Sequence, residues 1–574
     1  MMKKILLILI LITSIINSMT AQKTIEIIAT SDIHGAILPV DIVMGKDSIP
    51  SLAHISTYLK MQRNLSDREI LLVDNGDYLQ GNPVVYYYNF INKQDIHIGA
   101  EAFNDLGYDC MGIGNHDFEG GHEVYDKFRS DLNCPILGAN VIDNATGKPY
   151  FQPYEIFERC GKKIAVLGIS TPATPTWIPE TLISGLEFQD MIEAAKYWVP
   201  IIKEKEKPDV LIGLLHSGID FNFNYQDSTT YKNENASYLV AKQVDGFDVI
   251  IAGHDHQGHN IRMKNNFGNE VIIVAPTSVA KDFCSIEINF IGDKKEIKTH
   301  IYSTYSLGID YSFLKKYDAK LYEIEEYFLE PLGVITENIS AVEGLFMNDV
   351  ITNLIHAVQL EATGAEISFA APLSASSKIH KGTQKRRDLF KLYRFDNFLY
   401  CMEFSGKEIL DILEFSYWQW FNQMTSKNDY LIRYKDTKSD KLKKFPATFT
   451  PPYNYESAGG IIYTVDVSKP KGERITIISM ANGDKFELDK TYKVAVNSYR
   501  GTGGGKHLTE GTGIAQEKLK DRITYVSEYD IKYYIGEWLK KHSPYTPNTN
   551  SKNWKIEPES WYKAAYNREI NLFY

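Results

Sequence analysis

The stretch TIEIIATSDIHG at positions 24–35 decides the fold of this chain. Its first part is a run of apolar and β-branched residues, and it ends in a polar turn that carries Asp32 and His34. Continuous runs of Val, Ile and Leu are typical of strands that are buried on both faces of a sheet. The same form recurs in EILLVDNGDYLQG (69–81), YDCMGIGNHDFEGG (108–121), KIAVLGIST (163–171), DVLIGLLHSG (209–218), DVIIAGHDHQGH (248–259) and VIIVAPTSVA (271–280).

Helical stretches lie between these strands. SLAHISTYLKMQRNLS (51–66) and AAKYWVPIIKEKEK (194–207) repeat apolar residues at helical spacing. Strands that alternate with helices predict a layered α/β domain, which we place at 22–309.

Residues 310–330, DYSFLKKYDAKLYEIEEYFLE, indicate one amphipathic helix, which Pro331 and Gly333 then end. We predict that this helix links two domains. From 331 to 574 the chain has longer loops and more tyrosine, which favours a second domain of α/β or α+β type.

Residues 1–21 have the pattern of a signal peptide. Lys3 and Lys4 form a basic start, an apolar run follows at 5–16, and small polar residues come after it. The run is shorter than the roughly 20 apolar residues that a bilayer-spanning helix needs. The alternative is an uncleaved membrane anchor. We expect an exported protein, periplasmic or secreted, with no stable membrane anchor after cleavage.

The composition excludes several classes of protein. With 44% hydrophobic and 24% charged residues, the chain is neither disordered nor a fibre or a coiled-coil rod. The net charge of -11 argues against binding of a nucleic-acid polymer through bulk charge. The five cysteines contain no Cys-x-x-Cys motif, which argues against a disulfide scaffold and against zinc held by thiolates.

Five strand ends carry residue types that bind metals. They are Asp32 with His34, Asp77, Asn115 with His116 and Asp117, His216, and His254 with His256. In an α/β sheet the carboxyl ends of the strands face one crevice, so we expect these residues to converge. Each motif alone is common by chance, and only the ordered set carries weight. Carboxylate, imidazole and amide ligands suit zinc, manganese or iron, and their number predicts two ions that share a bridging carboxylate.

The set D-x-H, GD, GNH(D/E), H and GHxH, in this order, resembles the calcineurin-like metallophosphoesterase domain. Together with the second half, the chain resembles the exported 5′-nucleotidase superfamily. This resemblance implies a four-layer metallophosphatase β-sandwich flanked by helices, a linker helix and a separate nucleoside-binding domain. It leans toward the bacterial periplasmic 2′,3′-cyclic-nucleotide 2′-phosphodiesterase/3′-nucleotidase branch. The stretches that resemble this branch are LVDNGDYLQGNP (72–83), GHDH (253–256), VQLEATGAEIS (358–368), LYRFDNFLYCMEFSGKEI (392–409), PPYNYES (451–457) and NSYRGTGGG (497–505).

The resemblance also implies two divalent metal ions, of Mn, Zn, Fe or Co type, and their ligands. Asp32, His34 and His256 match the ligands of the first ion, Asp77 matches the bridging ligand, and Asn115, His216 and His254 match the ligands of the second ion.

His116 matches the catalytic histidine of the family, which stabilises the phosphoryl group or protonates the leaving oxygen. Related enzymes have an aspartate three residues later, in the pattern GNHEFD, which orients this histidine. Here Glu119 occupies that position with a longer side chain. Asp117 is the weaker candidate for this orienting role.

A nucleobase is gripped best by aromatic faces. Tyr453 and Tyr499 match the stacking pair of the family by local pattern, and Tyr455 is the alternative for the first position.

These features predict metal-dependent hydrolysis of phosphate esters of nucleotides, by a hydroxide that the two ions generate. We expect 2′,3′-cyclic nucleotides and 3′-nucleotides as substrates. The alternatives are a 5′-nucleotidase or UDP-sugar hydrolase of the same superfamily, and a nucleotide-binding protein with impaired catalysis. The nucleotide is the expected partner, and the oligomeric state is left open.

Overall fold

The computed structural model describes residues 23–574 except 224–225, 293, 348, 376, 436–441, 443 and 548–552. The predicted signal peptide at 1–21 lies outside the described residues. The chain divides into two compact units, one of residues up to Pro175 and Glu180–Tyr322, the other of Thr176–Pro179 and Glu323–Tyr574. The boundary at residues 322 and 323 falls within helix α9 (Asp318–Leu329). The domain limits 22–309 and 331–574 stay a prediction.

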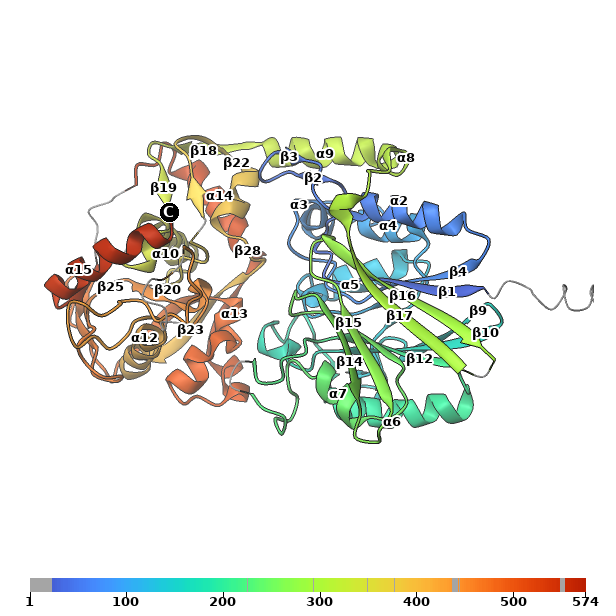
Figure 1. Ribbon diagram of the computed structural model, residues 1–574. Helices are drawn as coiled ribbons and strands as arrows, with labels where there is room; N and C mark the ends of the chain where they lie inside the picture. Colours follow the sequence, from blue (N-terminus) through green and yellow to red (C-terminus); the bar gives the residue numbers. More distant parts are fainter. Residues whose placement is uncertain are drawn as a thin grey trace, which may run out of the picture. The chain divides into compact units, whose positions relative to one another are not determined.

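The first unit contains two six-stranded sheets (Figure 1). In spatial order, one sheet consists of β17 (Lys294–Ser303), β16 (Asp282–Ile291), β1 (Thr24–Thr30), β4 (Arg68–Asp74), β5 (Cys110–Gly112) and β6 (Ile136–Leu137). The other consists of β14 (His259–Lys264), β15 (Glu270–Ala275), β13 (Val249–Ala252), β12 (Val210–His216), β10 (Lys162–Ser170) and β9 (Tyr154–Arg159).

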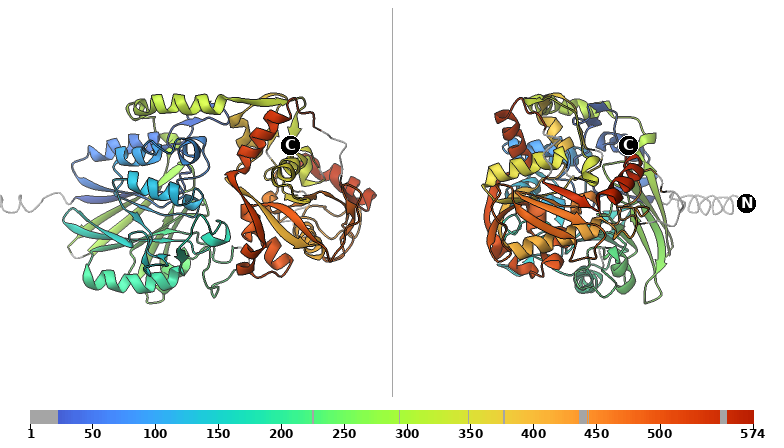
Figure 2. Two further views of the ribbon diagram at one scale, coloured as in Figure 1. Left: turned by 180° about the vertical axis from the view of Figure 1, so that it is seen from behind. Right: turned by 90° about the vertical axis from the view of Figure 1, so that its left-hand side faces the viewer.

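The two sheets pack face to face, and helices cover their outer faces. Ile164 and Val166 of β10 lie in the core between the sheets. Their neighbours Ala165 and Leu167 pack with α6 (Met191–Lys205) and α7 (Ser237–Gln243). On the outer side of the other sheet lie α2 (Leu52–Arg63) and α4 (Ile98–Leu106), as Figures 1 and 2 show. Strands buried on both faces explain the continuous apolar runs in the sequence, and the predicted four-layer sandwich is confirmed.

The strand ends that carry the predicted ligands belong to both sheets. In the first sheet β4 is parallel to β1 and to β5, with Thr30 opposite Asp74. In the second, β12 is parallel to β13, with Leu215 opposite Ala252. The candidate site therefore lies at the carboxyl ends of five strands from two sheets, and not at the edge of a single sheet.

The predicted linker helix at 310–330 is interrupted. The carboxylate of Asp310 caps the short helix α8 (Tyr311–Leu314), and a 3-10 turn at Lys315–Tyr317 separates α8 from α9. Asp310 also accepts a hydrogen bond from Ser56 Oγ at 2.6 Å, and it lies 2.6 Å from Lys60 Nζ. Both partners belong to α2, so the first turn is anchored to the first unit and the helix restarts after it.

The second unit is built on a five-stranded, mainly antiparallel sheet of β24 (Ser457–Gly459), β20 (Ile367–Ala370), β27 (Thr491–Asn497), β23 (Phe398–Ser405) and β28 (Ile523–Asp530). One apolar core joins this sheet to α10 (Val350–Thr363) and α14 (Ile531–Lys541). Another joins it to α12 (Gly406–Trp420) and to a three-stranded sheet of β26 (Ile475–Met480), β25 (Ile461–Asp466) and β29 (Trp554–Glu557). The second domain is thus of the predicted α+β type.

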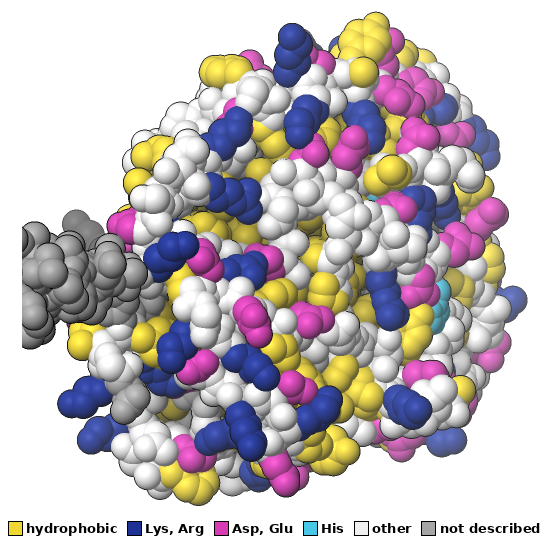
Figure 3. Space-filling view, turned by 90° about the vertical axis from the view of Figure 1, so that its right-hand side faces the viewer, with side chains coloured by type: hydrophobic (Ala, Val, Ile, Leu, Met, Phe, Trp, Pro, Cys, Tyr) yellow, Lys and Arg dark blue, Asp and Glu magenta, His cyan; other side chains and the backbone are white. Residues whose placement is uncertain are grey.

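Among the described residues, we find no helix with the length and apolar character needed to cross a membrane. On the face drawn in Figure 3, Lys and Arg side chains are interspersed with Asp and Glu side chains.

Candidate active site

Most of the predicted metal ligands have an unusual backbone. Five of them adopt positive φ: Asp32 (52°), His34 (48°), Asp77 (59°), His254 (73°) and His256 (57°). Non-glycine residues rarely adopt this left-handed region, and clusters of them mark functional sites, where the rest of the fold holds the strain. Here the left-handed residues turn the chain sharply just after β1, β4 and β13.

Glycines next to the ligands allow the strand ends to approach closely. A Cβ on Gly114 would lie 2.1 Å from Oδ1 of Asp77, and a Cβ on Gly253 would lie 2.3 Å from Oγ of Ser31. Any side chain at either position would push the loops apart. The glycines of the GNH and GHDH motifs are therefore explained by packing.

Asp32, His34, Asp77 and His256 form the first cluster of potential ligand atoms. One ligand atom of each lies within 4.8 Å of the others. Nε2 of His34 is 3.0 Å from Nε2 of His256, which is 3.4 Å from Oδ1 of Asp32. Two atoms that are each about 2.1 Å from one ion lie about 3–3.4 Å apart, so this spacing fits a shared metal.

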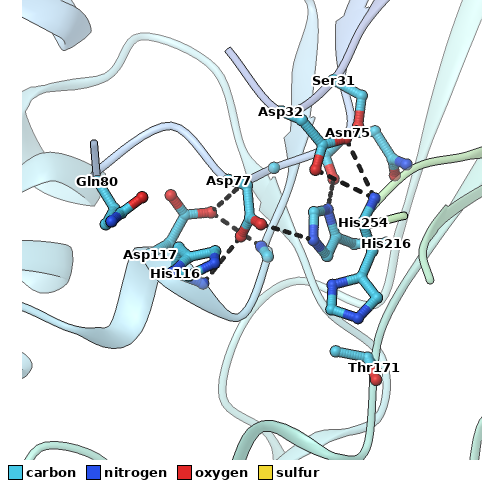
Figure 4. Close-up of polar contacts among 12 residues, drawn as sticks. Ser31, Asp32, Asn75, Asp77, Gln80, His116, Asp117, Thr171, His216 and His254 are labelled. Atoms are coloured by element: carbon cyan, nitrogen blue, oxygen red, sulfur yellow. Dashed lines mark hydrogen bonds and ion pairs between the residues drawn. The ribbon is translucent and has the colours of Figure 1, made fainter. Parts of the chain in front are cut away.

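Asp77, His216 and His254 form the second cluster, also with ligand atoms within 4.8 Å of one another. Nε2 of His216 lies 3.1 Å from Oδ2 of Asp77. Figure 4 shows the Asp77 carboxylate between His116 and His216. Asp77 belongs to both clusters, and within the described residues no other group of His, Cys, Asp or Glu meets the same criterion.

Asn115 supports the fit to a metal. Its Oδ1 is buried and has no hydrogen-bond partner among the described residues. A buried amide oxygen without a partner is costly, and a cation would satisfy it.

Hydrogen bonds to backbone carbonyls orient two of the imidazole rings. Nδ1 of His216 bonds to the carbonyl oxygen of Asn75 at 2.8 Å, and Nδ1 of His34 bonds to that of Gln80 at 3.2 Å. In the neutral form of each ring the proton is then on Nδ1, and Nε2 is turned toward the cluster with its lone pair.

Asp77 and its neighbours favour a charged carboxylate at the centre of the site. Burial raises the pKa of Asp77, but the imidazoles of His216 and His116 hold it well below its usual range. For His216, burial lowers the pKa, and the Asp77 carboxylate more than offsets this and raises it to about 9.

Asp117 has a role that the sequence did not reveal. Its Oδ2 accepts hydrogen bonds from the backbone N–H groups of Asp77 (2.9 Å) and Gly114 (2.8 Å). Its Oδ1 accepts those of Tyr78 (2.7 Å) and Leu79 (2.9 Å). Asp117 therefore fixes the loop of Asp77. The contacts with Asp77, Tyr78 and Leu79 span 38–40 positions of the sequence, so no local pattern signals them.

His116 lies beside the clusters. Its Nδ1 is 2.6 Å from Oε1 of Glu119, and its backbone N–H donates to Oδ1 of Asp77 at 2.8 Å. Burial lowers the pKa of His116, but the carboxylates of Glu119 and Asp77 outweigh it and raise the pKa to about 10. The longer Glu119 side chain thus reaches the ring, despite its departure from the GNHEFD pattern.

The two predicted stacking tyrosines are neighbours in the second unit. Tyr453 lies in a 3-10 turn at Pro452–Asn454, and Tyr499 lies in α13 (Ser498–Gly501). Their ring centroids are 6.3 Å apart with an interplanar angle of 83°, so the rings meet edge to face. Both rings are partly exposed.

Tyr455 lies in the core instead. Only 1% of it is exposed, and its ring stacks on Trp420 with centroids 4.8 Å apart and an interplanar angle of 8°. The alternative that Tyr455 is the first stacking residue is therefore wrong, because its ring faces are covered by protein.

Comparison with known proteins identifies the two domains. The calcineurin-like phosphoesterase family matches residues 25–258, and the 5′-nucleotidase C-terminal domain matches residues 332–510. The chain is 26% identical to a 2′,3′-cyclic-nucleotide 2′-phosphodiesterase/3′-nucleotidase of Yersinia enterocolitica, over 94% of this chain and 89% of the relative. It is 25% identical to a 5′-nucleotidase of Vibrio cholerae, over 90% of this chain and 93% of the relative.

Two solved structures share the fold. A Staphylococcus aureus protein assigned to the 5′-nucleotidases superposes with a TM-score of 0.76 at 21% identity, over 93% of this chain and 100% of that one. A 5′-nucleotidase precursor of Thermus thermophilus superposes with a TM-score of 0.63 at 19% identity, with the same coverage of 93% and 100%. The calcineurin-like fold implies divalent metals, and the Asp and His clusters of this chain fit them. The chain therefore belongs to the family in which a calcineurin-like phosphoesterase domain is joined to a 5′-nucleotidase C-terminal domain, and it is an enzyme that hydrolyses phosphoric esters.

Proposed function

We propose that this enzyme acts on nucleotides and that its substrates are 2′,3′-cyclic nucleotides and 3′-nucleotides. The observation that carries the proposal is Asp77, which is common to both clusters of ligand atoms. A shared carboxylate suits a pair of ions about 3.5–4 Å apart, a recurring arrangement in enzymes that cleave phosphate esters. The choice of substrate is supported by the Yersinia relative, which is named for these two activities.

Seven residues are proposed to hold two divalent ions of Mn, Zn, Fe or Co type. Asp32, His34 and His256 would hold one ion, Asn115, His216 and His254 would hold the other, and Asp77 would bridge them. When bound, such ions supply a nucleophilic water at neutral pH and neutralise the charge of the phosphoryl group.

His116 is proposed as the catalytic residue of the chain. Because Glu119 holds Nδ1, the opposite ring atom, Nε2, is the one available to the substrate. From there it would donate a hydrogen bond to the phosphoryl oxygen or a proton to the leaving ribose oxygen. Glu119 would act through His116, by keeping the ring oriented and protonated.

Tyr453 and Tyr499 are proposed to bind the base. Tyr499 donates a hydrogen bond from its hydroxyl to Oδ1 of Asn454 at 3.3 Å, which connects the two segments. The rings meet edge to face, so one of them would have to turn before a base could stack between both. Stacking on a base is worth about 1–3 kcal/mol and tolerates any base.

The test is phosphate release by the purified protein with Mn²⁺ and with EDTA. The substrates are 2′,3′-cyclic AMP with and without an added phosphatase, 3′-AMP and 5′-AMP. We expect Mn²⁺-dependent turnover of the first two, and its loss in Asp77→Asn but not in Asp220→Asn, an exposed aspartate of the same unit. Turnover of the cyclic substrate in EDTA would refute the metal mechanism.

A 5′-nucleotidase is the second candidate. It is supported by the Vibrio relative, which is named for that activity. Turnover of 5′-AMP and a UDP-sugar without the cyclic substrate would favour it. Tight metal and nucleoside binding without any turnover would instead favour a binding protein with impaired catalysis.

We also propose that the protein is exported, because of the signal-peptide pattern at 1–21. The mass of the protein isolated from cell fractions tests this. A mature chain that begins near position 22 outside the cytoplasm is expected, and a full-length cytoplasmic chain would contradict export.

A further inference from the structure

We propose that Glu234 is a positioning residue for His254. Oε1 of Glu234 lies 3.2 Å from Nε2 of His254, and only 7% of Glu234 is exposed. Glu234 lies in none of the motifs that resemble the family, and it precedes α7. The inference rests on the proposed role of His254 as a metal ligand.

The backbone of Glu234 is held at three points. Its N–H donates to Oε1 of Gln226 at 2.9 Å, and its carbonyl oxygen accepts from Oγ1 of Thr171 at 3.0 Å and from Oγ of Ser217 at 2.8 Å. Ser217 directly follows His216. The Glu234 carboxylate is therefore built into a rigid frame that also includes the end of β12.

The segment after Glu234 adds to this frame. Ala236 N–H donates to Oγ of Ser217 at 2.8 Å, and Oγ of Ser237 donates to the carbonyl oxygen of Ser217 at 2.7 Å. Oδ1 of Asn235 accepts from the N–H of Gly218 at 3.2 Å. One hydrogen-bond network thus connects the strand end of His216 with the residue that contacts His254.

In each of three potential ligand histidines, one ring nitrogen is turned away from the cluster and is hydrogen-bonded to another group. We call this group the outer partner, and its chemical type differs among the three. For His216 and His34 it is a neutral backbone carbonyl. For His254 it is the Glu234 carboxylate. A carboxylate fixes the proton on Nε2, leaves the lone pair on Nδ1 and makes the ring a stronger donor to a cation.

This asymmetry has a specific consequence. His254 belongs to the cluster with Asp77 and His216 and not to the cluster with His34 and His256. Loss of the Glu234 carboxylate should therefore weaken the binding of one ion and leave the binding of the other unchanged. Outer partners of this kind typically change metal affinity by about 10–100-fold.

The experiment measures Mn²⁺ binding to the metal-free full-length protein by calorimetry. In Glu234→Gln, which preserves the size of the side chain, we expect one binding step to weaken by about 10–100-fold and the other to stay unchanged. Glu234→Asp, which keeps the charge, should lie between this variant and the natural protein. The matched control is Glu187→Gln, at an exposed position of β11 (Leu186–Phe188), with no expected change.

A double-mutant cycle with His254→Ala separates the two proposals. If Glu234 acts through His254, then Glu234→Gln has no further effect on Mn²⁺ affinity in the His254→Ala background. Additive effects, or unchanged affinity in Glu234→Gln, would overturn the positioning role alone. Unchanged Mn²⁺ binding in His254→Ala would instead overturn the proposed metal site. A Glu234→Gln variant that fails to fold would also contradict the inference, because Glu234 would then be a general structural residue.

Discussion

The candidate sites of the two units consist of different types of side chain. In the first unit, polar side chains converge from five strand ends, and left-handed backbone and hydrogen bonds to the rings hold them in place. In the second unit, Tyr453 and Tyr499 lie in short helical turns, are partly exposed and meet edge to face. A metal site needs donor atoms at fixed distances, whereas an aromatic grip needs only flat apolar area. Substitutions should therefore abolish chemistry in the first unit and only shift affinity in the second.

Asp77 is the position where this contrast should be largest. We expect Asp77→Ala to lower kcat/KM by about a thousandfold or more, which corresponds to about 4 kcal/mol of lost transition-state stabilisation. The reason is that it removes a ligand common to both clusters. The measurement is Mn²⁺-dependent hydrolysis of bis(4-nitrophenyl) phosphate, with metal content determined in parallel. Retained activity with two bound ions would show that Asp77 does not bridge them.

His116 should show that chemistry in the first unit is separable from metal binding. His116→Ala is expected to lower kcat by about 10²–10⁴-fold, the usual range for loss of a positioned acid. The metal content should stay the same, because Asp32, Asp77 and the other potential ligands remain. A loss of metal in His116→Ala would place His116 among the ligands instead.

Glu119 should have a smaller effect of the same kind. We expect Glu119→Gln to lower kcat by about tenfold, since the ring keeps a hydrogen-bond partner but loses the adjacent negative charge. Glu119→Asp tests the length of the side chain, because the family pattern has aspartate here. If Glu119→Gln and His116→Ala together lower kcat by the product of their separate effects, Glu119 does not act through His116.

Tyr499 tests whether a substitution in the second unit changes only the affinity for the nucleotide. Tyr499→Ala should raise KM for 3′-AMP by about 5- to 150-fold, the equivalent of 1–3 kcal/mol of stacking. Hydrolysis of bis(4-nitrophenyl) phosphate, which has no base, should be unchanged. Tyr322→Ala, at a position that is 66% exposed, is the control. An equal loss with both substrates would mean that Tyr499 supports folding and not base binding.

Tyr455 should give the smallest effect. Tyr455→Phe keeps the ring on Trp420 and removes only a buried hydroxyl, so the free energy of unfolding should change by no more than about 1 kcal/mol. KM for 3′-AMP should not change. Denaturant unfolding and kinetics check both. A KM increase as large as that of Tyr499→Ala would restore Tyr455 as a stacking residue.

The fold of the first unit could be predicted because its sequence pattern is strong. Strands such as β12 are buried on both faces and read as continuous apolar runs, and each is followed by a polar turn. The potential ligands stand in those turns, so their order along the chain was enough to expect convergence. That the strand ends come from two sheets follows only from long-range pairing, such as that of β1 with β16.

Residues that act through contacts with distant parts of the sequence could not be predicted. From the sequence, Asp117 is a potential metal-binding residue or a partner of His116, whereas in the structure its carboxylate binds the loop of Asp77. Glu234 lies 20 positions before His254, and no sequence pattern around either residue predicts their contact. The interruption of the linker helix could not be predicted for a similar reason, because Asp310 makes its contacts with α2. Local patterns do not carry such tertiary contacts.

The second unit was harder because the chain contains 37 tyrosines. Tyr453 and Tyr455 are two positions apart in one loop, and only packing distinguishes them. Tyr455 faces Trp420 in the core, while Tyr453 meets Tyr499.

The residues with positive φ also predict which positions of this chain would be substituted first if selection for activity ceased. Aspartate and histidine at these positions are worse for the backbone than glycine, which adopts positive φ without steric cost. Under the proposed metal-binding role, the folded protein keeps them because their side chains hold the ions. A duplicated copy released from that requirement would therefore drift first at Asp32, His34, Asp77, His254 and His256, toward glycine and asparagine. Retention of all five in a related chain would then indicate that the chain still functions, even where the surrounding sequence has diverged.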